Sequence, residues 1–154
     1  MIATSGAALL KPSAVRALTK ELLPKATLVT PNVPEAEALT ESRIREPEDL
    51  RRAARILHER FGCAVLAKGG HLNTRREAID VFYDGKTELL LTTARVRAIK
   101  THGTGCTFSA AIAGYLALGQ NLEAVVQSAK NFVASAIRGS VSAAGHDVLD
   151  FGAK

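Results

Sequence analysis

Cysteine, aromatic residues and long apolar runs are all scarce in this sequence. Only Cys63 and Cys106 occur among 154 residues, which is too few for a disulfide scaffold, and no Cys/His set has the spacing of metal ligands. No apolar run approaches the ~20 residues needed to cross a bilayer, and no signal-peptide pattern opens the chain. The sequence therefore argues against export and membrane insertion and predicts a reducing, cytoplasmic setting.

Aromatic residues make up only 5% of the chain, although its net charge is +5. A positive chain attracts anions, but the basic residues are spread along the sequence. Arg51, Arg52 and Arg55 alternate with acidic residues on a probable helix, as on a solvated helix face. The composition thus argues against nucleic acid, and a nucleotide is a sufficient anionic partner.

The length and the order of the apolar segments indicate one α/β domain over residues 1–154. Apolar runs of strand length alternate with amphipathic segments, which predicts a layered fold with a mainly parallel sheet flanked by helices. Expected strands are 26–30 and 63–67, followed by a hairpin of 78–83 and 87–91 around Asp84-Gly85. Expected helices begin at Pro12, Pro34, Pro47 and Asn121, with a further helical segment over 110–118. Residues 140–154 are expected to form a loop or a docked terminus.

A turn of small residues, Thr101 to Ser109, runs directly into the helical segment 110–118. Glycine lets a backbone approach a ligand closely, and a helix start exposes unpaired N–H groups with a partial positive charge. We expect the N–H groups of Gly103, Thr104, Gly105 and Cys106 to bind an anion. The same field favours the thiolate of Cys106. The alternative is a tight turn with Thr104 as helix cap and Cys106 as a buried filler.

Two further strand ends carry polar residues. Asn32 and Glu35 follow the first strand and form an Asn-x-x-Glu pair suited to Mg²⁺, which prefers oxygen ligands and retains several waters; alternatively, Glu35 simply favours a helix N-terminus. Lys68, Gly69 and Gly70 follow the second strand, where a lysine beside two glycines can reach a phosphate or can be a surface lysine next to a turn. In open parallel sheets ligands gather at the carboxyl ends of strands, so these motifs are expected to converge.

The string THGTGCTFSAAIAGYLALG closely resembles the signature of the hydroxymethylpyrimidine/phosphomethylpyrimidine kinases of thiamin biosynthesis, in the ribokinase-like superfamily. The strings TPNVPEAEAL and VLAKGGHL resemble the same family. The resemblance implies an Mg²⁺ site near Asn32 and Glu35, a phosphate-binding lysine at Lys68, and nucleotide contacts that include Thr101. It places Cys106 where many ribokinase relatives have an aspartate base. Lys100 departs from the small or amide side chain common there.

The implied activity is transfer of the γ-phosphoryl group of ATP to hydroxymethylpyrimidine or its monophosphate, with ATP and Mg²⁺ as cofactors. One alternative is a pyridoxal or hydroxyethylthiazole kinase with the same phosphate-binding residues. Another is a non-catalytic nucleotide-binding or assembly module.

The resemblance covers residues 1–137 but maps only to the later part of the family chain. MIATSGAALL resembles an internal stretch of the family, and nothing here matches its early Asp-x-Ser-Gly-Gly-Ala-Gly segment. We therefore expect a chain lacking the N-terminal part of the fold, through truncation, a late start codon or a split gene. Acceptor binding should then be weak or absent in this chain alone. The sheet should end in an unpaired strand that favours a homo-oligomer or a companion chain.

Overall fold

The structure is a computed structural model that describes residues 1–2, 9–70, 72, 76–96, 103–143 and 146–152. These residues form two compact units, Met1–Thr92 and Thr93–Lys154. Each unit is described by itself below. A single-domain organisation over 1–154 stays a prediction.

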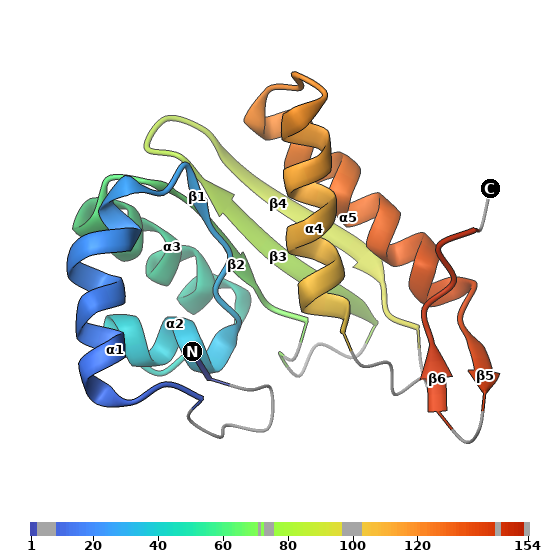
Figure 1. Cartoon of the computed structure of the whole chain (residues 1–154), viewed down its shortest axis with the longest axis horizontal. Helices are drawn as coiled ribbons and strands as arrows, with labels where there is room; N and C mark the ends of the chain where they lie inside the picture. Colours follow the sequence, from blue (N-terminus) through green and yellow to red (C-terminus); the bar gives the residue numbers. More distant parts are fainter. Residues whose placement is uncertain (3–8, 71, 73–75, 97–102, 144–145, 153–154) are drawn as a thin grey trace. The chain divides into compact units, whose positions relative to one another are not determined.

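The first unit contains most of a four-stranded sheet, in the order β1-β2-β3-β4 (Figure 1). Its strands are β1 (Leu28–Val29), β2 (Ala64–Lys68), β3 (Glu77–Tyr83) and β4 (Glu88–Ala94). β1 pairs with β2 in parallel, whereas β2 pairs with β3 antiparallel. The sheet in this chain is therefore mixed, rather than mainly parallel as predicted, because the hairpin supplies half of its strands. β1 lies at one edge.

The hairpin between β3 and β4 turns at Asp84-Gly85, as predicted. The Asp84 carboxylate accepts hydrogen bonds from the N–H groups of Lys86 and Thr87, at 2.9 and 2.7 Å. Gly85 has a φ of 95°, a value that side chains with a Cβ rarely adopt. These local interactions fix the register of the two strands.

Three helical segments accompany this sheet. The chain from Pro12 begins as α1 (Pro12–Ala17), tightens into a π-helical turn (Leu18–Leu22) and ends in a 3₁₀ turn (Leu23–Lys25). The next helices are α2 (Val33–Thr40) and α3 (Pro47–Phe61). Pro24 lies in the 3₁₀ turn, where its missing N–H and fixed φ stop a longer helix.

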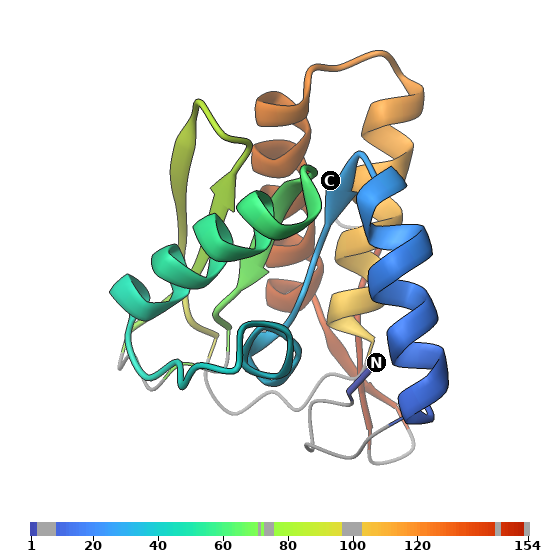
Figure 2. The same cartoon turned by 90° about the vertical axis from the view of Figure 1, so that its left-hand side faces the viewer.

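Helix α3 packs along β2 and β3 (Figure 2). Its bounds confirm the predicted helix, since Pro47 begins it and Gly62 ends it in a left-handed conformation with a φ of 72°. One stripe of its residues is buried: Leu50, Ala53, Ala54, Leu57 and Phe61. This stripe joins Val65, Ala67 and Val81 in one hydrophobic cluster. Burying each large side chain stabilises the fold by about 1.5–3 kcal/mol.

The second unit is built on two helices, α4 (Thr104–Ala117) and α5 (Leu122–Arg138), which pack against each other (Figure 1). Gly119, with a φ of 79°, follows α4, and the Asn121 side chain caps α5 by accepting a hydrogen bond from the N–H of Ala124 at 2.9 Å. Both features confirm predictions. None of the helices in the described ranges has the length and apolar character needed to cross a membrane.

The tail after α5 docks on that helix, as one of the two predicted alternatives has it: Leu149 is buried, and the N–H of Asp150 donates to the carbonyl of Ala136 at 3.2 Å. It forms an antiparallel pair, β5 (Val141–Ala143) and β6 (His146–Val148). Val141 pairs with Val148, yet both side chains are exposed. These two strands were not predicted, because so short a pair lacks the alternation of buried and exposed side chains that indicates a strand in a sequence.

Candidate functional site

The start of α4 carries the unpaired peptide N–H groups that the sequence predicts. The first N–H to bond within the helix belongs to Thr107, which donates to the carbonyl of Gly103 at 2.9 Å. The four N–H groups from Gly103 to Cys106 precede it, as at any helix start. No acidic residue lies in this first turn. The helix dipole therefore adds a partial positive charge that favours an anion.

Gly103 caps this helix in a left-handed conformation, with a φ of 82°. A Cβ added at Gly103 would meet no atom within 4 Å, so the position requires glycine for its backbone angle rather than for space. The turn thus directs the chain into α4 through a backbone conformation that glycine adopts readily.

The two cysteines occupy different environments. Cys106 is the third residue of α4 and is exposed. Cys63 is buried before β2, and this burial raises the pKa of its thiol. A reacting group must be reachable, so Cys106 is the cysteine available for chemistry and Cys63 serves packing.

In the first unit, the ends of β1 and β2 lie side by side. The N–H of Lys68 donates to the carbonyl of Pro31 at 2.8 Å, and Asn32 forms a parallel bridge with Lys68. The Asn32–Glu35 pair therefore adjoins the Lys68-Gly69-Gly70 turn. The expected convergence at the carboxyl ends of parallel strands holds for these residues.

Asn32 and Glu35 form a reciprocal cap on α2. The Asn32 side-chain oxygen accepts from the N–H of Glu35 at 2.8 Å, and the Glu35 carboxylate accepts from the N–H of Asn32 at 3.0 Å. The same carboxylate accepts from the nitrogens of Met1 and Ile2, at 3.0 and 3.2 Å. Burial alone would raise the pKa of Glu35, but these hydrogen bonds outweigh it and lower the pKa. Glu35 is therefore held as a carboxylate.

The Lys68-Gly69-Gly70 turn packs tightly at only one of its two glycines. A Cβ on Gly69 would collide with the carbonyl oxygen of Ile79 and lie 2.7 Å from a methyl group of Leu50. A Cβ on Gly70 would meet nothing within 4 Å. Gly69 thus lets the turn run against β3, while Gly70 lies on the open side.

Sequence reasoning missed one residue of this cluster, Asp80. It is a buried carboxylate on β3, with 4% of its surface exposed, and it accepts a hydrogen bond from the N–H of Gly69 at 2.9 Å. A charged residue inside the apolar run Ala78–Tyr83 was the available signal, because charged side chains are rarely buried without a partner.

The predicted site residues thus fall into two groups. Asn32, Glu35 and Lys68-Gly69-Gly70 come together at the strand ends of the first unit, and residues 103–106 form the start of α4 in the second. Thr101 lies outside the described residues, as does Lys100. The nucleotide contact predicted for Thr101 stays a prediction.

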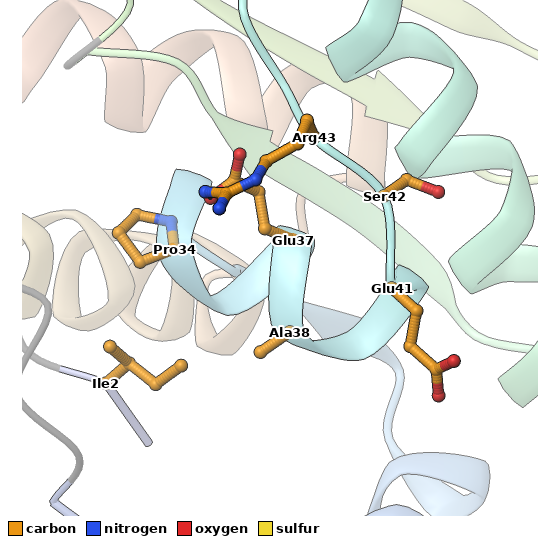
Figure 3. Close-up of a pocket in the computed structure, with 7 residues that line it drawn as sticks. All are labelled: Ile2, Pro34, Glu37, Ala38, Glu41, Ser42 and Arg43. Atoms are coloured by element: carbon orange, nitrogen blue, oxygen red, sulfur yellow. The ribbon is translucent and has the colours of Figure 1, made fainter.

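A surface pocket of about 480 Å³ lies beside α2 and contains none of the predicted site residues (Figure 3). It is lined by Ile2, Pro34, Glu37, Ala38, Glu41, Ser42 and Arg43. Glu37 bridges to Arg43 at 3.8 Å and accepts from the N–H of Ile44 at 2.9 Å. Glu37 and Arg43 in this pocket therefore stabilise the loop that follows α2.

Comparison with known proteins decides the family. The model of the phosphomethylpyrimidine kinase family matches residues 1–149. The chain belongs to this family. The hydroxymethylpyrimidine/phosphomethylpyrimidine kinase of Rhizobium meliloti is 48% identical over 138 residues, which are 89% of this chain and 52% of that protein.

Solved structures of this family and its neighbours share the fold. The pyridoxal kinase of Staphylococcus aureus, in complex with AMP-PCP and pyridoxal, superimposes with a TM-score of 0.87 at 40% identity, covering 96% of this chain and 55% of that one. Phosphomethylpyrimidine kinase from Clostridium difficile gives 0.73 at 36% identity, covering 89% and 54%. These matches confirm the predicted α/β, ribokinase-like fold. The chain spans about half the length of these relatives.

Proposed function

We propose that this chain provides the phosphate-binding part of a kinase that transfers the γ-phosphoryl group of ATP to hydroxymethylpyrimidine or to its monophosphate, in thiamin biosynthesis. The observation that carries the proposal is the start of α4, where four peptide N–H groups precede the first helical bond, from Thr107 to Gly103. Phosphoryl transfer depends mainly on positioning and on neutralising charge on the moving group. Unpaired N–H groups at a helix start supply both.

Lys68 adds a positive charge on the side of the β- and γ-phosphates. Support comes from its place at the carboxyl end of β2. There the N–H of Lys68 donates to Pro31, just after β1, and the N–H of Gly69 donates to Asp80 on β3. An ammonium group binds phosphate as a point charge. Gly70 and Thr101 complete the nucleotide contacts in this proposal.

Mg²⁺ fits Asn32 and Glu35 through water rather than by direct ligation. The Glu35 carboxylate already accepts three hydrogen bonds, out of about four acceptor positions. Within the described ranges, no three His, Cys, Asp or Glu side chains cluster closely enough to hold a metal ion. A hydrated Mg²⁺ often keeps several waters, so one metal-bound water on Glu35 suits this pair. When bound, the ion would neutralise charge on the nucleotide phosphates.

Cys106 acts as the general base. When hydroxymethylpyrimidine is the acceptor, the thiolate accepts the proton of its hydroxyl group. The oxygen of that hydroxyl forms a bond to the γ-phosphorus as the bond from that phosphorus to the β,γ-bridging oxygen breaks and ADP leaves. The exposure of Cys106 in the first turn of α4 supports this role, because an acceptor bound beside the N–H groups of this turn can reach the sulfur.

A second candidate acceptor is pyridoxal. The S. aureus structure bound to pyridoxal and AMP-PCP resembles this chain as closely as any structure described above. Both acceptors present a hydroxymethyl group on an aromatic ring, so the same phosphate-binding residues serve either. A third candidate is a non-catalytic nucleotide-binding module, in keeping with a chain that spans half of its relatives' length.

A homo-oligomer or a companion chain completes the site in this proposal. Support comes from β1, which has two residues and lies at an edge of the sheet. Such an edge offers unpaired backbone groups to another chain. Light scattering that finds a monomer in the presence of nucleotide and acceptor contradicts this part of the proposal. A cytoplasmic location stays a prediction.

The experiment is ATP turnover by the purified chain with hydroxymethylpyrimidine, its monophosphate, pyridoxal and the thiazole alcohol, alongside binding of AMP-PCP. Turnover with a pyrimidine acceptor supports the proposal, and preference for pyridoxal selects the second candidate. Binding of AMP-PCP without turnover of ATP favours the third candidate, the non-catalytic nucleotide-binding module. Absence of both overturns the proposal.

A further inference from the structure

The carboxylate of Asp80 lies at the point where the chain leaves β2. The register of β2 and β3 places Asp80 opposite Lys68, so both residues lie on the same face of the sheet. The Asp80 carboxylate accepts a hydrogen bond from the N–H of Gly69, the next residue after Lys68, at 2.9 Å. One buried side chain thus contacts the first peptide group beyond the strand.

Burial makes this contact costly to lose. Only 4% of Asp80 is exposed, and a buried carboxylate without hydrogen-bond donors loses its solvation without compensation. Hydrogen bonds from an N–H group to an ionised carboxylate are shorter and stronger than those between neutral groups. Asp80 therefore holds the Gly69 peptide in one orientation.

Packing around Gly69 restricts the same turn. The site of a Cβ on Gly69 is filled by the carbonyl oxygen of Ile79, a methyl group of Leu50 at 2.7 Å and one of Leu72 at 3.0 Å. The N–H of Lys68 is bonded to Pro31 of the neighbouring strand end. The chain thus leaves β2 along one path, with Lys68 at its start.

We infer that Asp80 is a positioning residue of the phosphate-binding site: it orients the Lys68-Gly69-Gly70 turn so that Lys68 meets the nucleotide phosphates. This inference rests on the proposed function, in which Lys68 binds phosphate. Asp80 acts through the turn and does not itself touch the nucleotide. Its role is to keep the lysine in place before the nucleotide arrives, which preserves affinity for the phosphates.

The test compares nucleotides that differ in their phosphates. Binding of AMP-PCP and of AMP is measured by calorimetry for the wild-type chain and for Asp80→Asn, which keeps the shape of the side chain and removes its charge. Affinity for AMP-PCP is expected to fall about 10-fold, the order of one lost charge-assisted contact to phosphate. Affinity for AMP is expected to stay the same, because AMP lacks the β- and γ-phosphates.

Asp84→Asn is the matched control. Asp84 lies on the same hairpin and also accepts backbone N–H groups, from Lys86 and Thr87, but it lies in the turn that follows β3, away from the Lys68-Gly69-Gly70 turn. The control is expected to leave the ratio of AMP-PCP to AMP affinity unchanged. Lys68→Ala is expected to reduce that ratio as Asp80→Asn does. The double variant is expected to reduce it no further, because both substitutions remove the same contact between Lys68 and phosphate.

Hydrogen exchange of the Gly69 amide gives a readout that needs no nucleotide. The amide is expected to be protected in the wild-type chain and to exchange faster in Asp80→Asn, while Asp84→Asn leaves it protected. An unprotected Gly69 amide in the wild-type chain overturns the inference without any variant.

The two proposals fail in distinguishable ways. If the wild-type chain binds AMP-PCP no better than AMP, the proposed function is contradicted and the inference with it. If the wild-type chain prefers AMP-PCP and Asp80→Asn retains that preference, only the inference is overturned. Equal losses for AMP-PCP and AMP in Asp80→Asn also overturn it, because they indicate a general structural role.

Discussion

Adjacent glycines at the end of β2 offer a sharp test of how tightly the first unit is packed. Replacing Gly69 with alanine places a Cβ against the carbonyl oxygen of Ile79, which belongs to the backbone of a central strand and cannot move aside without disturbing it. The same Cβ lies 2.7 Å from a methyl group of Leu50 in the buried stripe of α3. Replacing Gly70 with alanine meets no atom within 4 Å.

The expected magnitude follows from these contacts. Overpacking a well-filled core costs about 1–3 kcal/mol, so Gly69→Ala is expected to lower the free energy of unfolding by that amount. In a chain of this size each kcal/mol shifts the melting temperature by about 2–4 °C. Gly70→Ala restricts the unfolded chain without a clash, and its stability is expected to stay equal or to rise by up to about 1 kcal/mol.

Circular dichroism measures both variants, through thermal melts and urea titrations beside the wild-type chain. The reasoning predicts a lower midpoint for Gly69→Ala and an unchanged or higher one for Gly70→Ala. Equal midpoints for Gly69→Ala and the wild-type chain, or a larger loss for Gly70→Ala, refute the packing described for this turn.

Three other predictions concern charge, capping and chemistry. Burial alone would raise the pKa of Glu88, but the hydrogen bonds from Arg51 and Arg55 outweigh burial and lower the pKa below its ordinary 4.5. The charged Glu88 therefore contributes stability above pH 4.5, and this contribution is lost as the pH falls through the lowered pKa. In urea titrations near neutral pH, the free energy of unfolding of Glu88→Gln should be lower than that of the wild-type chain by up to about 1 kcal/mol, and this difference should disappear in acid. A difference that grows in acid contradicts the direction of the pKa shift. Asn121→Ala removes the cap of α5 and should cost about 1 kcal/mol in the same assay, whereas a change at exposed Asn131 in mid-helix should cost less. Cys106→Ala should reduce turnover about 10²–10⁴-fold while AMP-PCP affinity is retained, and equal activity in this variant rules out the base role.

Much of the fold could be predicted because local signals agree with the packing. Helix α3 has a proline at its start, a glycine at its end and an apolar stripe between them, and its observed bounds are those predicted. The continuous apolar run of β2 predicts a strand buried on both faces, and Ala64 to Ala67 are all buried. Where cap, periodicity and burial agree, the sequence determines the element.

Elsewhere the sequence lacked the decisive information. The pair of β5 and β6 has exposed valines at its ends, so no alternation marks it. Asp80 was overlooked because its role depends on a cross-strand neighbour that periodicity alone does not identify. Glu35 caps α2 with Asn32, which is one of the two interpretations open at the start. Its hydrogen bonds lower its pKa and keep it charged, and the metal contact stays a prediction.

Backbone resonances of residues 103–106 test the central claim most directly. In a ¹H–¹⁵N titration of the full chain with AMP-PCP and Mg²⁺, the amide signals of Gly103, Thr104, Gly105 and Cys106 should shift together and saturate with the affinity measured by calorimetry. AMP should leave them in place. The account is contradicted if saturating AMP-PCP shifts the amide signals of other residues but leaves the signals of residues 103–106 unchanged.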